Sequence, residues 1–188
     1  MKTVIHMLLT LTFIGIVSGG LLSQISEWAE PKIEEHRKAE TARAIYLVQP
    51  EAKSYERITN VDFEVYKVFD EMKNSIGFAL PYEGNGFQGK IRLMVGLNDE
   101  LNKLKGLQIL EQVETPGLGT KITEENFLKQ FLNLSAQPMV NWVKAVPPEK
   151  QNEIQTITGA TISSKAVVII LNDGIKKLRD AEKDGGVK

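Results

Sequence analysis

The 188-residue chain has a formal net charge of −1 at pH 7, with 25% charged and 42% hydrophobic residues, which is ordinary for one globular domain with an appended segment. The balanced charge and the lack of a basic stripe argue against nucleic acid as a partner. Because the chain has no cysteine and only two histidines, the composition excludes disulfides, thiol nucleophiles and thiolate-bound iron–sulfur clusters, and we expect no metal site.

An uncharged apolar stretch from Val4 to Ile25 is the first feature along the chain. At about 1.5 Å rise per residue, a helix of this length covers a hydrocarbon core of about 30 Å, and Trp28 follows at the position of an interfacial aromatic residue. We therefore predict a transmembrane anchor over residues 1–26. A cleaved signal peptide is the alternative, because the small residues at 17–19 fit a cleavage site. Basic residues flank the stretch on both sides, so charge alone does not orient it.

A charged stretch rich in helix formers follows the anchor. We predict a helical stalk over residues 27–53, with a break or kink at Pro31. His36 has no partner at helical spacing, so it is a solvated side chain and not a metal ligand. Residues 54–183 then form the folded domain, and residues 184–188 are expected to be a frayed tail.

The folded domain begins with alternating patterns of β-branched and aromatic residues separated by polar turns. Four stretches predict strands: 61–70, 75–82, 90–98 and 104–112. In the third stretch an apolar residue recurs at every second position from Ile91 to Leu97, which indicates a half-buried strand. The short connections, such as the turn at 98–103, favour antiparallel pairing because a parallel crossover needs a dozen or more residues.

Two helical patterns complete the domain. Residues 123–134 predict a helix with Thr123 as its N-cap and with Phe127, Phe131 and Leu134 on one face. A closing helix is predicted from about Ser163, with an apolar stripe made of Ala166, Val167, Ile170, Leu171, Ile175 and Leu178. The expected fold is therefore α+β, with a mainly antiparallel sheet and flanking helices, carried on a single N-terminal transmembrane helix.

Two loops in this domain place glycine beside hydroxyl residues. The segment 113–121 (VETPGLGTK) follows a predicted strand, and glycine there permits positive φ and close approach of a ligand. The segment 156–164 carries five hydroxyls just before the closing helix, whose free N–H groups would favour a phosphate. A tight turn and a merely well-capped helix are the alternatives. Neither loop has the spacing of a P-loop or of a dinucleotide-binding fingerprint.

The sequence of these loops resembles a known family. ETPGLG at 114–119 together with TGATISS at 158–164 resembles the FMN-binding domain of the RnfG/NqrC family, whose members are subunits of ion-pumping electron-transfer complexes with covalently bound FMN. GFQGKI at 86–91 and NWVKAV at 141–146 are similar to further segments of that domain. The short length resembles RnfG more than the longer NqrC.

The resemblance implies a site built from both loops. In the family a flavin transferase joins FMN through its phosphate to the last threonine of the motif, which is Thr161 here. The further implied cofactor-binding residues are Thr158, Gly159, Ala160, Ser163 and Ser164, with Glu114, Thr115, Gly117, Leu118, Gly119, Thr120 and Lys121. Leu118 would lie against the flavin ring, and the Gly119–Thr120 backbone would lie near its polar edge. One departure is Gln155, which stands where the family has an acidic residue, with Glu153 nearby.

The function implied by the resemblance is electron relay, with no catalytic residue of the chain's own. The chain would be the FMN-carrying subunit of a membrane ion-pumping ferredoxin:NAD oxidoreductase (Rnf) complex, with its soluble domain on the outer face of the cytoplasmic membrane. Its partners would be the other subunits and, during maturation, the flavin transferase. The alternatives are the equivalent C subunit of a Na⁺-translocating NADH:quinone oxidoreductase and a cofactor-free, membrane-tethered binding or assembly domain.

Overall fold

The computed structural model describes residues 2–187, and the chain divides into two units, Met1–Glu40 and Thr41–Lys188. The first unit is helical, because α1 runs from Lys2 to Val48 without interruption. The break expected at Pro31 is absent from this helix. Within the described part of the chain, α1 is the one helix that is long and apolar enough to cross a membrane.

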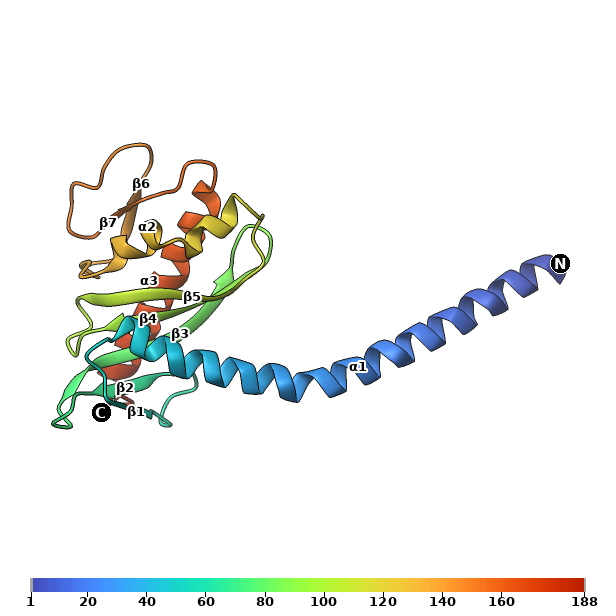
Figure 1. Cartoon of the computed structure of the whole chain (residues 1–188), viewed down its shortest axis with the longest axis horizontal. Coiled ribbons are helices and arrows are strands. Elements are labelled where there is room, and N and C mark those ends of the chain that lie inside the picture. Colours follow the sequence, from blue (N-terminus) through green and yellow to red (C-terminus); the bar gives the residue numbers. More distant parts are fainter. Residues whose placement is uncertain (1, 188) are drawn as a thin grey trace. The chain divides into compact units, whose positions relative to one another are not determined.

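A five-stranded antiparallel sheet forms the centre of the second unit (Figure 1). Its strands are β1 (Ser54–Arg57), β2 (Tyr66–Phe69), β3 (Ser75–Asn85), β4 (Lys90–Leu97) and β5 (Leu104–Gln112). They pair in sequence order, each antiparallel to the next, which confirms the expected antiparallel sheet. The strand expected over 61–70 is shorter, as β2, and β1 was not predicted.

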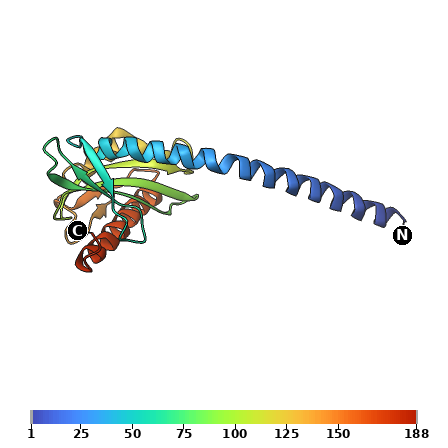
Figure 2. The same ribbon diagram turned by 90° about the horizontal axis from the view of Figure 1, so that it is seen from below.

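Both faces of the sheet are covered, so the expectation of a half-buried third strand is wrong. Every residue of β4 after Lys90 is buried. Leu93 belongs to the larger core beneath α3, whereas Met94 belongs to a second cluster that includes Ile45 and Val48 of α1. Figure 2 shows the end of α1 and α3 (Thr161–Lys183) on opposite faces of the sheet.

The last turns of α1 therefore belong to the folded unit, which begins at Thr41. The residue pattern placed the boundary at 54, because helix-forming composition alone does not distinguish a solvated stalk from a helix that packs on a sheet. Ala44, Ile45 and Val48 are each no more than 2% exposed, and Gln49 donates through Nε2 to the carbonyl of Leu97 at 2.8 Å.

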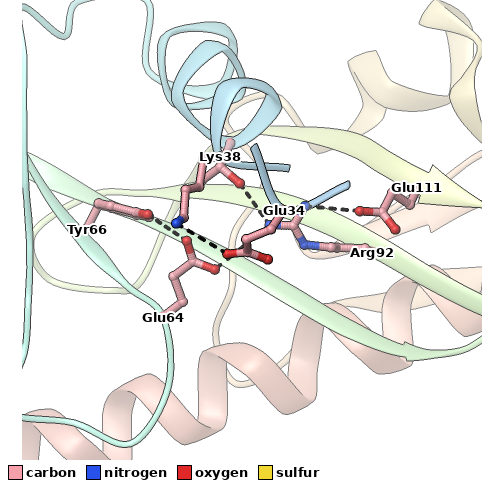
Figure 3. A network of polar contacts seen from close by, with 7 residues as sticks. Glu34, Lys38, Glu64, Tyr66, Arg92 and Glu111 are labelled. Atoms are coloured by element: carbon pink, nitrogen blue, oxygen red, sulfur yellow. Dashed lines mark hydrogen bonds and ion pairs between the residues drawn. The ribbon is translucent and has the colours of Figure 1, made fainter. Parts of the chain in front are cut away.

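A polar network closes the same face of the sheet (Figure 3). Arg92 on β4 is 8% exposed. Its guanidinium donates to Thr41 Oγ1 at 2.8 Å and contacts Glu111 Oε1 at 3.3 Å and Glu64 Oε2 at 3.8 Å. The Tyr66 hydroxyl donates to Glu64 Oε1 at 2.6 Å, and burial is the main cause that raises the pKa of Tyr66. Arg92 thus joins the end of α1 to two strands.

The segment expected as one helix over 123–134 is three short pieces instead. They are η1 (Gly119–Thr123), α2 (Glu125–Leu128) and η2 (Lys129–Phe131). Thr123 is not an N-cap; Glu124 holds that position of α2 without a side-chain hydrogen bond. The short pieces still bury Phe127 and Phe131, whose rings meet edge to face with centroids 5.3 Å apart.

Two short strands that the sequence did not predict lie beside this segment. β6 (Asn141–Val143) and β7 (Glu153–Gln155) pair in parallel as a separate two-stranded sheet. Asn172 on α3 holds the chain just before β6, because its side-chain amide donates to the Val140 carbonyl at 2.8 Å and accepts from the Val140 N–H at 2.9 Å.

α3 begins at Thr161, two residues before the predicted start, and its far end is fixed. Gly186 N–H donates to the Ala181 carbonyl and Gly185 N–H to the Glu182 carbonyl, the two bonds of a Schellman cap. Val187 is 3% exposed and belongs to the core. The tail is therefore ordered as far as Val187, in contrast to the expected fraying.

Candidate functional site

A cavity of about 500 Å³ lies where the two glycine-bearing loops meet at the N-terminus of α3. Its walls are made by Phe87, Thr115, Leu118, Gly119, Lys144, Ala145, Thr156, Thr158, Gly159, Ala160, Thr161, Ile162 and Ser163. The loops are in direct contact, since a Cβ placed on Gly159 would lie 3.5 Å from Leu118 Cδ2. The volume falls within the range of about 300–1,000 Å³ that is common for small-molecule and cofactor sites.

Eight of the residues implied by the resemblance line this cavity. They are Thr115, Leu118, Gly119, Thr158, Gly159, Ala160, Thr161 and Ser163. Five others do not line it: Glu114, Gly117, Thr120, Lys121 and Ser164. These five lie behind or beside the wall, where several of them fix its shape.

The first loop is held by its own hydrogen bonds. The Thr115 carbonyl accepts from the backbone N–H groups of Leu118 and Thr120, each at 3.2 Å. Thr120 Oγ1 accepts from the N–H of Gly117 at 3.0 Å, and Gly117 has a φ of 75°, a conformation that glycine adopts without a steric penalty. Gly117 and Thr120 therefore shape the loop, and Lys121 lines a neighbouring cavity of about 320 Å³ together with Thr158.

The second loop is closed onto α3 by a buried serine. Ser164 is fully buried; its hydroxyl accepts from the Ile157 N–H at 3.1 Å and donates to the Ala160 carbonyl at 2.9 Å. Gly159, with a φ of 85°, makes the turn between these two points. The chain thus enters α3 with Thr161 as the first helical residue, facing the cavity.

Some hydroxyl groups of this loop make hydrogen bonds, and others do not. Thr156 donates to the Val143 carbonyl, Ser163 to Glu114 and Ser164 to Ala160. Among residues 2–187, the side chains of Thr158 and Thr161 have no hydrogen-bond partner, and both line the cavity.

The first turn of α3 likewise has backbone N–H groups without a side-chain cap. Ala160 occupies its N-cap position, and no side chain caps the helix. The interpretation of the loop as a merely well-capped helix is therefore wrong. Free N–H groups and the positive end of the helix dipole adjoin the unengaged hydroxyl of Thr161, an arrangement that favours a phosphate group.

Glu114 lies buried behind the cavity wall, with 3% of its surface exposed. Its Oε1 accepts from the backbone N–H groups of Phe87 and Gln88 at 2.8 and 3.1 Å, and its Oε2 accepts from the Ser163 hydroxyl at 2.5 Å. A Cβ on Gly119 would lie 2.8 Å from Oε2, so glycine is required there. Glu114 therefore joins three cavity-forming segments.

Gln130 fixes the strand that leads into the second loop. Its Oε1 accepts from the Gln155 N–H at 2.7 Å, and its Nε2 donates to the Gln155 carbonyl at 3.2 Å. These bonds use the backbone of residue 155, so they do not depend on the side chain at the position where the sequence departs from the family pattern.

Five cavity residues were not among the predicted ones: Phe87, Lys144, Ala145, Thr156 and Ile162. Phe87 and Ile162 are 60% and 58% exposed, and they give the cavity an apolar rim. Ala145 has a φ of 59°, which is uncommon for a residue with a Cβ. The sequence held a signal for each of them, because they lie in the three segments GFQGKI, NWVKAV and 156–164, but it did not single them out within those segments.

The donor set fits a phosphorylated, partly apolar cofactor better than a metal. The wall combines small residues, an open helix N-terminus, the cation of Lys144 and the apolar side chains of Leu118, Phe87 and Ile162. The described part of the chain has no group of three or more histidine, cysteine, aspartate or glutamate side chains placed to hold a metal ion.

Comparison with known proteins gives concordant results. The FMN-binding domain family matches residues 86–176. The chain is 26% identical over 182 residues to the G subunit of the ion-translocating oxidoreductase complex of Methanosarcina acetivorans, covering 93% of this chain and 94% of that one. It is 35% identical over 99 residues to the G subunit of the Na(+)-translocating ferredoxin:NAD(+) oxidoreductase complex of Acetobacterium woodii, with 53% of this chain matched. The chain spans about half the length of that second relative, 47%.

The fold also matches a solved structure. The C subunit of the Na(+)-translocating NADH-quinone reductase of Parabacteroides distasonis superimposes with a TM-score of 0.60 at 16% identity, covering 78% of this chain and 94% of that one. At this identity the match concerns the fold alone.

Proposed function

We propose that the chain belongs to the RnfG/NqrC family of proteins with an FMN-binding domain and that it is the flavin-carrying electron-transfer subunit of an Rnf-type ion-translocating oxidoreductase complex. The observation that carries the proposal is the state of Thr161. Thr161 lines the cavity at the uncapped N-terminus of α3, and its hydroxyl has no hydrogen-bond partner among residues 2–187.

Thr161 is the residue that we propose as the point of covalent attachment. Its Oγ1 would form the new P–O bond to the flavin phosphate and pass its proton to the transferase, while the leaving group of an activated flavin phosphate would depart with the electron pair of the broken P–O bond. A flavin transferase supplies this activated flavin. The open N–H groups of the first turn of α3 then hold the phosphate oxygens, and Thr158 offers a second free hydroxyl.

The remaining cavity residues would hold the cofactor around this link. Leu118 and Phe87 offer apolar surfaces to the isoalloxazine ring, and Lys144 offers a cation. Bound FMN supplies the one-electron chemistry, while the protein sets its position and its potential. Glu114, Gly117, Thr120 and Lys121 belong to the supporting loop, and none of the chain's side chains needs to act as a general acid or base.

The membrane assignment rests on α1 and on the relatives. The chain is membrane-anchored, with the apolar part of α1 as the anchor. We place the folded domain on the outer face, where a covalent tether prevents irreversible loss of the cofactor, and we assign the other subunits of the complex as its electron-transfer partners. The equivalent C subunit of a Na⁺-translocating NADH:quinone oxidoreductase is the second candidate, since a solved C subunit shares the fold.

Fluorescence of the denatured protein tests the attachment. The protein is co-expressed with a flavin transferase, separated on a denaturing gel and viewed under ultraviolet light. We expect a fluorescent band for the unmodified sequence and for Thr161→Ser, which keeps a hydroxyl. Thr161→Val, which keeps the shape but lacks the hydroxyl, should be dark. A fluorescent Thr161→Val band, or a dark unmodified band with a competent transferase, would contradict the proposal and favour the cofactor-free assembly domain.

Protease accessibility tests the side of the membrane. Protease added to protoplasts, whose cytoplasmic membrane is intact, should cleave the folded domain from its anchor. Complete protection until the membrane is permeabilised would reverse the proposed orientation. A cytoplasmic marker protein that stays intact is the control for cell integrity.

A further inference from the structure

The buried carboxylate of Glu114 lies directly behind the residues that line the cavity. Glu114 does not line the cavity, yet its carboxylate contacts two residues that do, Gly119 and Ser163. It is 3% exposed, so water does not screen it effectively.

This charge has no cationic partner within the described part of the chain. All three groups that contact the carboxylate oxygens are neutral donors, namely the N–H groups of Phe87 and Gln88 and the hydroxyl of Ser163. The carboxylate therefore accepts three hydrogen bonds and receives none from a cation. Buried carboxylates in proteins usually pair with a cation, so a buried one held only by neutral donors next to a cavity calls for a role.

We propose that the fixed charge of Glu114 lowers the reduction potential of the flavin held in this cavity. The inference rests on the proposed function, because it requires a flavin there. Reduction adds negative charge to the flavin, and a nearby buried carboxylate opposes that addition with an energy that grows as the effective dielectric constant falls. Lys144 lines the same cavity and acts in the opposite direction, so the effect of Glu114 is measured as a difference between variants.

Glu114 also has a structural role, and the two roles can be separated. In Glu114→Gln the remaining oxygen still accepts from the two backbone N–H groups, and the new amide can donate to the Ser163 hydroxyl, which accepts as well as donates. This variant removes the charge and keeps the hydrogen bonds. Ser163→Ala does the reverse, because it removes a hydrogen bond and keeps the charge.

The test is a reductive titration of the full-length, flavin-loaded protein in detergent, followed by flavin absorbance with redox dyes. Flavin content is determined first for each variant. At a fixed potential, we expect the ratio of reduced to oxidised flavin to rise about tenfold in Glu114→Gln, which equals about 59 mV for a one-electron couple. Ser163→Ala alone measures the effect of the lost hydrogen bond, and the double variant Glu114→Gln/Ser163→Ala should show the same tenfold rise relative to Ser163→Ala.

The outcomes are distinguishable. An unmodified protein without flavin would refute the proposed function, and with it this inference, before any variant is measured. Flavin-loaded Glu114→Gln with an unchanged potential would refute the inference alone. An equal shift in Ser163→Ala would show that geometry and not charge sets the potential.

Discussion

Ile45 offers the sharpest test of where the folded domain begins. It lies in the last turns of α1, is 0% exposed and packs in the cluster that contains Val68, Ala79 and Met94. Leu47, two residues further along the same helix, is 63% exposed. Ile45→Ala and Leu47→Ala therefore remove similar apolar groups from the same helix, one from the interior and one from the surface.

The expected costs differ several-fold. Replacing a buried isoleucine with alanine lowers the free energy of unfolding by about 2–5 kcal/mol, and complete burial at this position places Ile45→Ala at about 3 kcal/mol. A surface substitution of this kind changes it by about 0.5 kcal/mol or less. Against a total of about 5–15 kcal/mol for a typical domain, the loss at Ile45 is large.

Urea unfolding of a soluble form that begins at residue 27 measures both values, with far-ultraviolet circular dichroism as the signal. We expect a lower midpoint for Ile45→Ala with an unchanged slope, and no resolvable change for Leu47→Ala. A form that begins at residue 54 should lack a cooperative transition. If Ile45→Ala matched the unmodified form, or if the form beginning at 54 were equally stable, the end of α1 would be a stalk and not part of the domain.

Two further predictions concern α3. Arg179 donates from Nη2 to the carbonyls of Leu101 and Ala136 at 2.7 and 3.0 Å, so Arg179→Met should lower the free energy of unfolding by about 2 kcal/mol, whereas Lys176→Met on the exposed side should be neutral in the same urea experiment. The Tyr82 hydroxyl donates to the carboxylate of Asp173 at 2.7 Å, and this hydrogen bond raises the pKa of Tyr82 to about 12. The stability that this hydrogen bond contributes is complete below about pH 10 and is lost as the pH rises through 12. Tyr82→Phe should therefore remove one phenolate transition from the absorbance titration and flatten the alkaline loss of stability; an unchanged titration would contradict the assignment.

The strands that form the central sheet were predictable because their pattern is local. Alternation from Ile91 to Leu97 and the short turn to the next strand are visible in the sequence, and they gave the antiparallel pairing. The burial of the second face was not visible, since it depends on α1, which contacts the sheet from far away in the sequence. The short strands β6 and β7 were not predicted, because a strand of three residues is too short to show an alternating pattern.

The position of the site was predictable from its two loops, but the separate roles of the hydroxyl groups within them were not. Five hydroxyls in one segment look equivalent in sequence. Only the fold assigns Ser164 to closing the loop and Ser163 to Glu114, and leaves Thr158 and Thr161 without partners among residues 2–187. The burial of Glu114 likewise depends on Gly119, which makes room for it.

Mass spectrometry of the peptide that contains Thr161, from protein isolated out of its native membrane, tests the central claim most directly. We predict that this peptide carries the mass of FMN less one water and that fragmentation places the addition on Thr161. An unmodified Thr161, or a flavin attached to another residue of the chain, would contradict the account.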